Sequence, residues 1–319
     1  MRPLKQKNHL NRSSSSAPRI TIFGIHSADW TEALGNDAAV WSRLGVQSIQ
    51  TLPGYAIDAP NVLVQLGNSV LIPLMEPHIR NCPRVGYGLF PDRDAVDLFA
   101  NKKTFADYAL RNDLADMCPR DYGNTEAHYP CVLKRIDLNA GIGVEIVHNQ
   151  AELKSLLNQP MWAGHDYIVQ EYVASDSDFV THMVCRNGKT KWHCTYQLFI
   201  NPPGGIQQPG NTVLRSPIII SEDVLERLNR FLLPLKYNGP VNFDYKIDHT
   251  GAVKVMEINP RLGGSLMVPE NIDDLEAALR CIIKNAVTPA ARLRNIARRL
   301  RRKAGSLKRR VLAGLAKNN

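Results

Sequence analysis

Apolar and polar residues alternate along two neighbouring runs near the end of the chain, Val241–Ile247 and Ala252–Ile258, which Asp248–Gly251 separates. A glycine-ended turn between two alternating runs predicts a β-hairpin. If Thr250 and Gly251 form a two-residue loop, Asp244 lies directly opposite Glu257. Side chains two apart on a strand share a face. One face of this hairpin is therefore polar, and we expect the other to be filled by Val241, Phe243, Tyr245, Ile247, Met256 and Ile258.

The polar face of the hairpin carries Asn242, Asp244 and Lys246 on one strand, with Glu257 and Asn259 across from them. Directly opposed carboxylates repel and destabilise a bare hairpin. A hard cation between them removes that cost, and Mg²⁺ binds through one or two protein carboxylates together with substrate phosphates. The hairpin thus predicts a cation site. The alternative is a solvated polar face, and a longer loop would shift the register and separate the two acids.

Residues 20–98 alternate strand-like and helix-like runs. Ile20–Ile25 and Val46–Leu52 flank a helical stretch that stops at Gly45, and Val62–Leu66 and Ser69–Pro73 are further short apolar runs. This alternation predicts a small open α/β sheet. Ligands of such sheets collect beyond the strand ends. We therefore mark two residues there as candidates for substrate contacts, against the alternative of an exposed loop: Glu76 and His78.

Residues 99–290 contain several segments with the chemistry of phosphate binding. Asn101 opens a helix that begins with Lys102 and Lys103. Two lysines fit poorly at the start of a helix, because that end is already positive, and a nearby phosphate would resolve the misfit. A buried-type strand ends at Lys134, and a loop follows it with Gly141 and Gly143. Glycines allow a backbone to approach phosphate closely. A solvated lysine pair and a plain hairpin turn are the alternatives.

The chain then continues through a strand into Glu171, Tyr172 and Val173, whose backbone groups can face an adenine edge. Asn187-Gly188 predicts another hairpin turn. A Gly- and Pro-rich loop spans Asn201–Pro217, and such a loop is either a lid or plain surface. Its Arg215 suits a substrate carboxylate or phosphate, although a solvated arginine is the alternative.

Composition and charge fit a globular protein with 44% hydrophobic and 22% charged residues. The formal net charge is +9, but residues 1–19 carry five basic residues and residues 291–319 carry eleven, without any acid, so the charge between them is −7. An acidic body argues against a nucleic-acid groove.

We expect residues 1–19 to be a disordered basic lead-in. We expect residues 291–319 to form a basic amphipathic helix that binds an anionic membrane or an acidic partner, and a frayed tail is the alternative. The absence of an export signal predicts a cytoplasmic protein.

The run Met256–Arg261, followed by Gly263-Gly264 and preceded by an Asp thirteen positions before the Glu, resembles the ATP-grasp superfamily. The resemblance covers roughly residues 101–290 and implies an α/β fold of two α+β subdomains that grip MgATP. It places a small pre-ATP-grasp α/β domain at residues 20–98 and the ATP-grasp domain at 99–290, split near residue 172. The residues quoted above occur in the order of the family's parts.

The resemblance also implies roles for individual residues. Lys102 rather than Lys103, together with Lys134, Gly141 and Gly143, would contact the phosphates. Glu171, Tyr172 and Val173 would bind adenine. Asp178 would bind the ribose, although the family often has Glu there and Asp176 competes. The metal ligands would be Asp244, Glu257 and Asn259, for Mg²⁺ or Mn²⁺, with Arg261 at the transferred phosphate and Lys134 and Arg215 assisting catalysis.

The usual chemistry of the superfamily is ATP-dependent ligation of a small-molecule carboxylate to an amine through an acyl phosphate. Two alternatives share the resemblance: a kinase or carboxylating enzyme on the same fold, and a non-catalytic ATP-binding protein at a membrane or an acidic partner. The sequence names neither substrate. The oligomeric state is open, and a homodimer is compatible with the chain.

Overall fold

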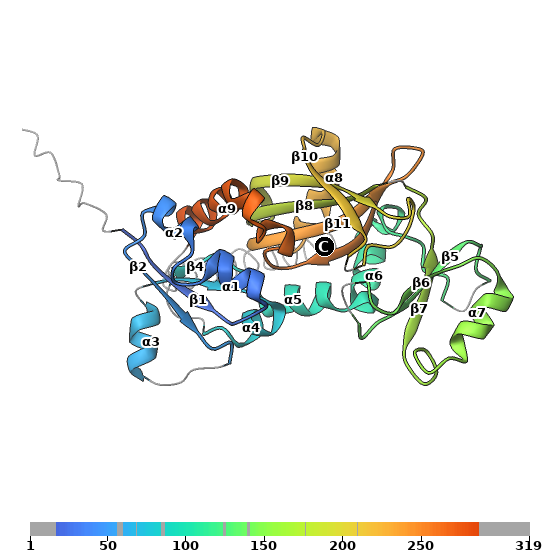
Figure 1. The fold of residues 1–319 in the computed structure, drawn as a ribbon, viewed down its shortest axis with the longest axis horizontal. Helices are drawn as coiled ribbons and strands as arrows, with labels where there is room; N and C mark the ends of the chain where they lie inside the picture. Colours follow the sequence, from blue (N-terminus) through green and yellow to red (C-terminus); the bar gives the residue numbers. More distant parts are fainter. Residues whose placement is uncertain are drawn as a thin grey trace, which may run out of the picture.

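The computed structural model describes residues 17–55, 60–67, 69–83, 87–123, 126–138, 141–175, 177–208 and 210–286. Three sheets follow one another along the molecule, with the N-terminal sheet at one end and the smallest sheet at the other (Figure 1). The predicted basic helix at 291–319, and nearly all of the predicted lead-in at 1–19, lie outside the described residues. No helix among the described residues is long and apolar enough to cross a membrane.

The N-terminal sheet is parallel, with the strand order β2-β1-β3-β4. Its strands are β1 (Arg19–Phe23), β2 (Ser48–Leu52), β3 (Val70–Pro73) and β4 (Tyr87–Gly88). Its helices are α1 (Ala28–Leu34), α2 (Ala39–Leu44), α3 (Pro60–Gly67) and α4 (Glu76–Asn81). The apolar run at 62–66 is therefore helical, since a proline in the first helical position and a glycine at the end favour a helix.

Two helices lead from this sheet to the rest of the molecule: α5 (Arg93–Ala100) and α6 (Lys102–Arg111) (Figure 1). The side chain of Asn101 caps α6 as predicted, because it accepts hydrogen bonds from the backbone N–H groups of Lys103 and Thr104 at 2.9 and 3.2 Å. A short 3-10 turn, η1 (Ala115–Met117), follows α6. The cap fixes the first turn of α6, and the side chains of Lys102 and Lys103 project from this turn.

A small antiparallel sheet with the order β6-β5-β7 comes next. It consists of β5 (Cys131–Arg135), β6 (Val144–Val147) and β7 (Tyr167–Glu171), and α7 (Gln150–Leu157) connects its last two strands. One core cluster joins this sheet to α7 and is built around the buried side chains of Leu133, Val147 and Trp162. The small sheet thus has its own core.

The largest sheet is antiparallel, with the order β10-β9-β8-β11-β12. Its strands are β8 (Ser177–Arg186), β9 (Lys189–Ile200), β10 (Thr212–Ile218), β11 (Gly239–Ile247) and β12 (Val253–Asn259). The turn between β8 and β9 holds Asn187 and Gly188 at positive φ, as the Asn-Gly pair predicts. Arg215 lies on an edge strand rather than in a loop. Pro217 is tolerated there because an edge strand needs fewer backbone donors.

Both faces of the large sheet are covered. On one face, α9 (Ile272–Asn285) and the N-terminal sheet share a core with it, and two 3-10 turns, η2 (Gly264–Leu266) and η3 (Pro269–Asn271), precede α9. On the other face, α5, α6 and α8 (Glu222–Leu232) pack against Phe243, Tyr245 and Ile258. The acidic pair Asp273 and Asp274 lies within the first turn of α9, where carboxylates stabilise the positive end of a helix.

Candidate active site

The hairpin β11–β12 pairs Asp244 with Glu257 and Asn242 with Asn259, as predicted, but by a different route. Its loop runs over residues 248–252 rather than two residues, because the Asp248 carboxylate accepts hydrogen bonds from the backbone of Thr250 and Ala252. The longer loop shifts the register by one residue, and a β-bulge at Met256 shifts it back. Met256 is that extra residue, and the prediction that it joins the apolar face is wrong.

The two opposed acids differ in environment. Glu257 is exposed, whereas Asp244 is half-buried and receives a hydrogen bond from Asn259 Nδ2 at 2.9 Å. Burial and the nearby charge of Glu257, partly opposed by Arg261, together raise the pKa of Asp244 to about 7. Below about pH 7, a proton on Asp244 therefore offsets the repulsion that we expected a cation to relieve.

The metal-ligand set at this hairpin is small. Among the described residues, no group of three or more His, Cys, Asp and Glu side chains is arranged to hold a metal ion. Two carboxylates and the amide of Asn259 are hard oxygen donors of the kind that Mg²⁺ prefers, and Mg²⁺ usually completes its shell with phosphate oxygens and water. The residues present fit a magnesium ion that arrives with a nucleotide better than a permanently bound one.

One lysine from the small sheet, Lys134, approaches these acids, and Lys102 approaches Lys134. Lys134 on β5 is half-buried, and burial lowers its pKa while the charges of Glu257, Asp244 and Asp178 raise it and that of Lys102 lowers it. Lys102 Nζ donates to the carbonyl of Leu138 at 3.2 Å, whereas Lys103 is exposed. Neither Lys102 nor Lys134 forms an ion pair with a described residue. The charge of Lys134 lies near the two acids without an ion pair to any described residue, which suits the binding of a polyphosphate.

The glycine loop lies next to the Gly- and Pro-rich segment that precedes β10. Gly141 and Gly143 both have positive φ, and a Cβ on Gly141 would stand 2.1 Å from the carbonyl oxygen of Gln207. Tyr172 donates from its hydroxyl to the carbonyl of Gly204 at 2.8 Å. The segment around 204–208 therefore contacts both the predicted phosphate loop and the predicted adenine strand.

The predicted adenine and ribose residues are already engaged. The Glu171 carboxylate accepts from the backbone N–H of Arg120 at 3.0 Å and lies 3.4 Å from Lys254 Nζ, and its own N–H donates to the Arg120 carbonyl. Val173 is buried. Asp178 forms an ion pair with Lys246 on β11. The adenine role of Glu171, Tyr172 and Val173 and the ribose role of Asp178 stay predictions, and Asp176 lies outside the described residues.

Arg215 and Arg261 approach a common buried histidine. Burial, together with the charges of both arginines, lowers the pKa of His182 to about 3, so this imidazole is neutral. Its Nε2 lies 2.6 Å from the hydroxyl of Ser265. The Nε of Arg215 is buried and has no hydrogen-bond partner among the described residues. An arginine with an unsatisfied buried donor is suited to bind an anion.

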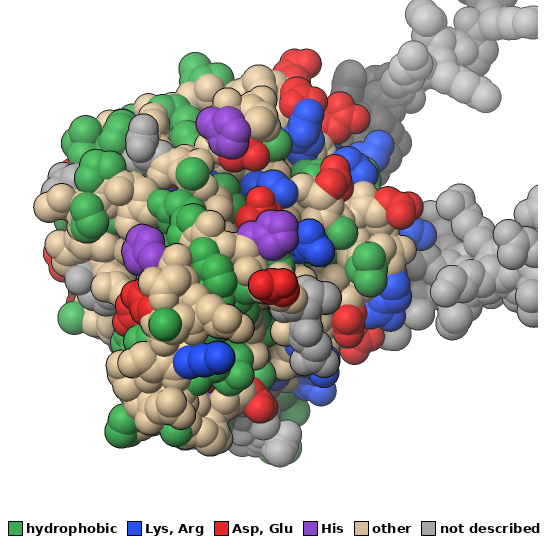
Figure 2. Space-filling view, turned by 90° about the vertical axis from the view of Figure 1, so that its right-hand side faces the viewer, with side chains coloured by type: hydrophobic (Ala, Val, Ile, Leu, Met, Phe, Trp, Pro, Cys, Tyr) green, Lys and Arg blue, Asp and Glu red, His purple; other side chains and the backbone are tan. Residues whose placement is uncertain are grey.

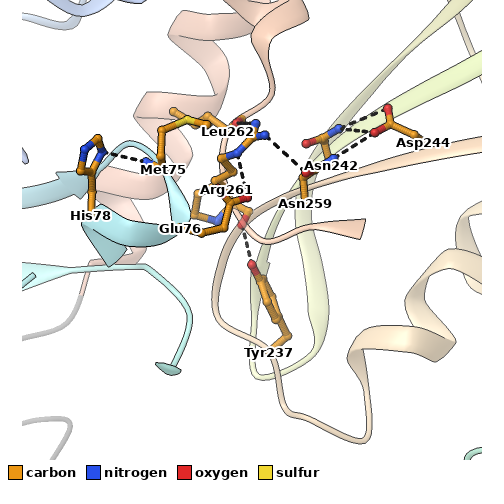
Figure 3. Close-up of polar contacts among 10 residues, drawn as sticks. Met75, Glu76, His78, Tyr237, Asn242, Asp244, Asn259, Arg261 and Leu262 are labelled. Carbon is orange, nitrogen blue, oxygen red and sulfur yellow. Dashed lines mark hydrogen bonds and ion pairs between the residues drawn. The ribbon is translucent and has the colours of Figure 1, made fainter. Parts of the chain in front are cut away.

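Arg261 connects the hairpin to the N-terminal sheet (Figure 3). Its Nε donates to the carboxylate of Glu76 at 2.9 Å, and its Nη2 donates to the Asn259 side chain at 3.3 Å. Asn259 in turn donates to Asp244. The sequence marked Glu76 and Arg261 separately. It missed their contact, as well as the approach of His182 and Ser265, because no local pattern links residues so far apart in the chain.

Gly263 packs directly over this polar cluster. A Cβ at this position would stand 2.3 Å from Cε1 of His182 and 3.1 Å from Cγ of Asn242. We expect Gly263→Ala to destabilise the protein by about 1–3 kcal/mol, as overpacking of a well-packed interior does. Gly264→Ala is the matched control, because the nearest atom to its Cβ, Trp30 Nε1, is 4.0 Å away. Urea unfolding of both variants tests this, and equal stabilities would contradict the packing described.

The surface at the small-sheet end of the molecule shows no separation of charge by sign. On the face in Figure 2, acidic and basic side chains of the described residues are intermixed, with apolar side chains between them. This distribution offers no broad basic field to a polyanion on that face.

No family model matches the chain. Over 151 residues it is 24% identical to the arginine-specific large chain of carbamoyl phosphate synthase from Bacillus subtilis (strain 168), a match that covers 46% of this chain and only 14% of that protein. Among solved structures, D-alanine–D-alanine ligase from Bacillus anthracis, complexed with ATP, has a TM-score of 0.56 and 16% identity, with coverage of 89% of this chain and 100% of that one.

The biotin carboxylase domain of 2-oxoglutarate carboxylase from Hydrogenobacter thermophilus, in complex with MgADP, ADP and bicarbonate, also has a TM-score of 0.56. It is 14% identical, with coverage of 80% of this chain and 66% of that one. At these identities the likeness concerns the fold. The three sheets, their order along the chain and these neighbours together show that the protein has the ATP-grasp fold, preceded by a small parallel α/β sheet.

Proposed function

We propose that this protein is an ATP-dependent ligase that joins a carboxylate to an amine through an acyl phosphate. The observation that carries the proposal is the pairing of Asp244 with Glu257 across a hairpin, faced by the unpaired Lys134 of the small sheet. A magnesium nucleotide requires carboxylates for its metal ion and cationic side chains for its phosphates. The acids of the large sheet and the lysine of the small sheet are groups of these two kinds.

The residues divide into three roles. Asp244, Glu257 and Asn259 would hold Mg²⁺, which would neutralise charge on the β- and γ-phosphate oxygens of ATP. Lys102 and Lys134 would bind the phosphates from the opposite side. Arg261 would stabilise the phosphoryl group during its transfer, because a guanidinium aimed at developing charge acts most strongly where water is excluded. Gly141, Gly143 and the segment at 204–208 would cover the nucleotide.

Arg215 would anchor the carboxylate substrate. Its buried Nε lacks a partner among the described residues, and it shares the surroundings of His182 with Arg261. A carboxylate held there would lie near the transferred phosphoryl group, and positioning of this kind can account for much of the rate of such reactions. No side-chain nucleophile is required.

A screen for ADP release tests the proposal. The purified full chain is given MgATP with pairs drawn from panels of carboxylic acids and amines, and Glu257→Gln serves as the inactive control. We expect ADP and phosphate only when an acid and an amine are both present. ADP with a phosphorylated product would instead indicate a kinase, and ADP that depends on bicarbonate would indicate a carboxylating enzyme. ATP binding without ADP release from any pair would contradict the proposal.

The cytoplasmic location and the homodimer stay predictions. The membrane contact of residues 291–319 is also a prediction, and it lies outside the described residues.

A further inference from the structure

Glu76 is placed next to the proposed reaction centre although it belongs to a helix that follows a strand of the N-terminal sheet. It is the first residue of α4, just beyond the carboxyl end of β3. Its carboxylate lies 2.9 Å from Arg261 Nε, and the two side chains are only 16% and 18% exposed. Figure 3 shows the contact, and shows the hydrogen bonds that continue from Arg261 to Asn259 and Asp244 of the β11–β12 hairpin.

The turn that presents Glu76 is held firmly. His78 Nδ1 accepts a hydrogen bond from the backbone N–H of Met75 at 3.2 Å, which closes the first turn of α4. The His78 ring fills space left by two glycines, because a Cβ on Gly24 would stand 2.2 Å from it and a Cβ on Gly54 would stand 2.0 Å from it. Burial lowers the pKa of His78, which favours the neutral ring that can accept this bond. Glu76 is therefore directed at Arg261 by packing.

A carboxylate in this position is unfavourable for two of the three substrates. ATP and the acid are both anionic, so Glu76 repels them and partly neutralises the guanidinium that should attract them. The protonated amine is the cationic substrate, and it must come within about 3–3.5 Å of the acyl carbon beside the same phosphoryl group. The charge of Glu76 suits that substrate.

We propose that Glu76 binds the ammonium group of the amine substrate and accepts one of its protons; this inference rests on the proposed ligase function. Arg261 turns to the phosphoryl group, and the ammonium replaces it as the partner of Glu76. One proton moves to the Glu76 carboxylate, and the nitrogen lone pair forms a C–N bond with the acyl carbon. The C–O bond to phosphate breaks, and phosphate leaves with a second proton from the nitrogen. Glu76 then releases its proton to solvent.

A purely structural role, in which Glu76 only positions Arg261, predicts a different outcome for Glu76→Gln. The glutamine oxygen still accepts from Arg261 Nε but carries no charge and takes no proton. Hydroxylamine with MgATP and a panel of amino acids and small carboxylic acids reports acyl phosphate as a hydroxamate, because this nucleophile reacts in its neutral form. Amide formation with an amine panel reports the complete reaction. Glu226→Gln, an exposed acid on α8, is the matched control.

We expect Glu76→Gln to form hydroxamate at a rate within about twofold of wild type and amide at least about 10²-fold more slowly, as loss of a general base does. The amide rate of this variant should recover with rising pH as the free amine becomes more abundant. Parallel loss of hydroxamate and amide, or no loss of either, would overturn the assignment. A wild-type protein that forms neither product would instead contradict the ligase function itself.

Discussion

Asp244→Asn should lower ATP turnover by about 10³-fold or more while the protein stays folded. The substitution removes a carboxylate from the proposed metal site, and several kcal/mol of charge stabilisation correspond to this factor. The side chain keeps its size, and an amide can still contact Asn259. Turnover is measured as ADP release with the substrate pair from the screen, and circular dichroism monitors the fold.

The same variant should be more stable than wild type at pH 8 without Mg²⁺. The pKa of Asp244 is raised to about 7 in the folded protein, so folding favours its protonated form and stability is lost as the pH rises from about 4 through 7. The loss amounts to at most about 4 kcal/mol at pH 8. We expect an increase in Tm of several degrees at pH 8 and a smaller one at pH 5.

Asp107→Asn is the control for both measurements, because Asp107 is exposed on α6. Turnover of Asp244→Asn close to wild type would rule out the metal role of this residue. A lower Tm of this variant at pH 8 would show that the Asp244 carboxylate stabilises the fold without a metal. That result would contradict the raised pKa of Asp244.

Lys134→Met should weaken both the binding and the turnover of ATP, with a loss of about 10²-fold in kcat/KM. Lys134 is close enough to Glu257 and Asp244 for their charges to raise its pKa, and it forms no ion pair with a described residue. A charge-assisted hydrogen bond to phosphate contributes roughly 1.5–3 kcal/mol, which gives a loss of this order. Methionine fills nearly the same space, so we expect no loss of thermal stability.

Lys103→Met provides the matched control, since this lysine is exposed beside Lys102. The increase in Tm on addition of MgATP gives a second readout that does not depend on knowing the acid and the amine. If Lys134→Met kept the full increase, this lysine would not contact the nucleotide. If Lys103→Met lost it, the assignment of Lys102 as the phosphate ligand would be wrong.

Local patterns predicted much of the fold. The Asn-Gly turn after β8, the cap at Asn101 and the α/β alternation of the first hundred residues are short-range features, and the structure confirms them. The apolar run at 62–66 could not be assigned from its hydrophobicity, because short apolar runs occur in strands and in helices alike. In the structure this run is part of a helix. Arg215 lies on a strand because tertiary pairing with β9 overrode the Gly- and Pro-rich character of its neighbours.

The site was only partly predictable for a related reason. Asp244 and Glu257 share one hairpin, so their pairing could be read from the chain, although the longer loop and the bulge at Met256 could not. Contacts such as Glu76 with Arg261 join residues 185 positions apart. Such contacts depend on how the N-terminal sheet docks against the large sheet, and this docking is determined by the shared core rather than by any local sequence pattern.

The central claim is that Asp244 and Glu257 share one metal ion with the phosphates of ATP. A crystal structure with Mn²⁺ and a non-hydrolysable ATP analogue tests it most directly, because the anomalous signal of Mn²⁺ locates the metal. The account predicts a metal ion in direct contact, at about 2.0–2.3 Å, with a carboxylate oxygen of each of the two acids and with the analogue's phosphates. A metal bound elsewhere, or a nucleotide whose phosphates lie away from this hairpin, would contradict it.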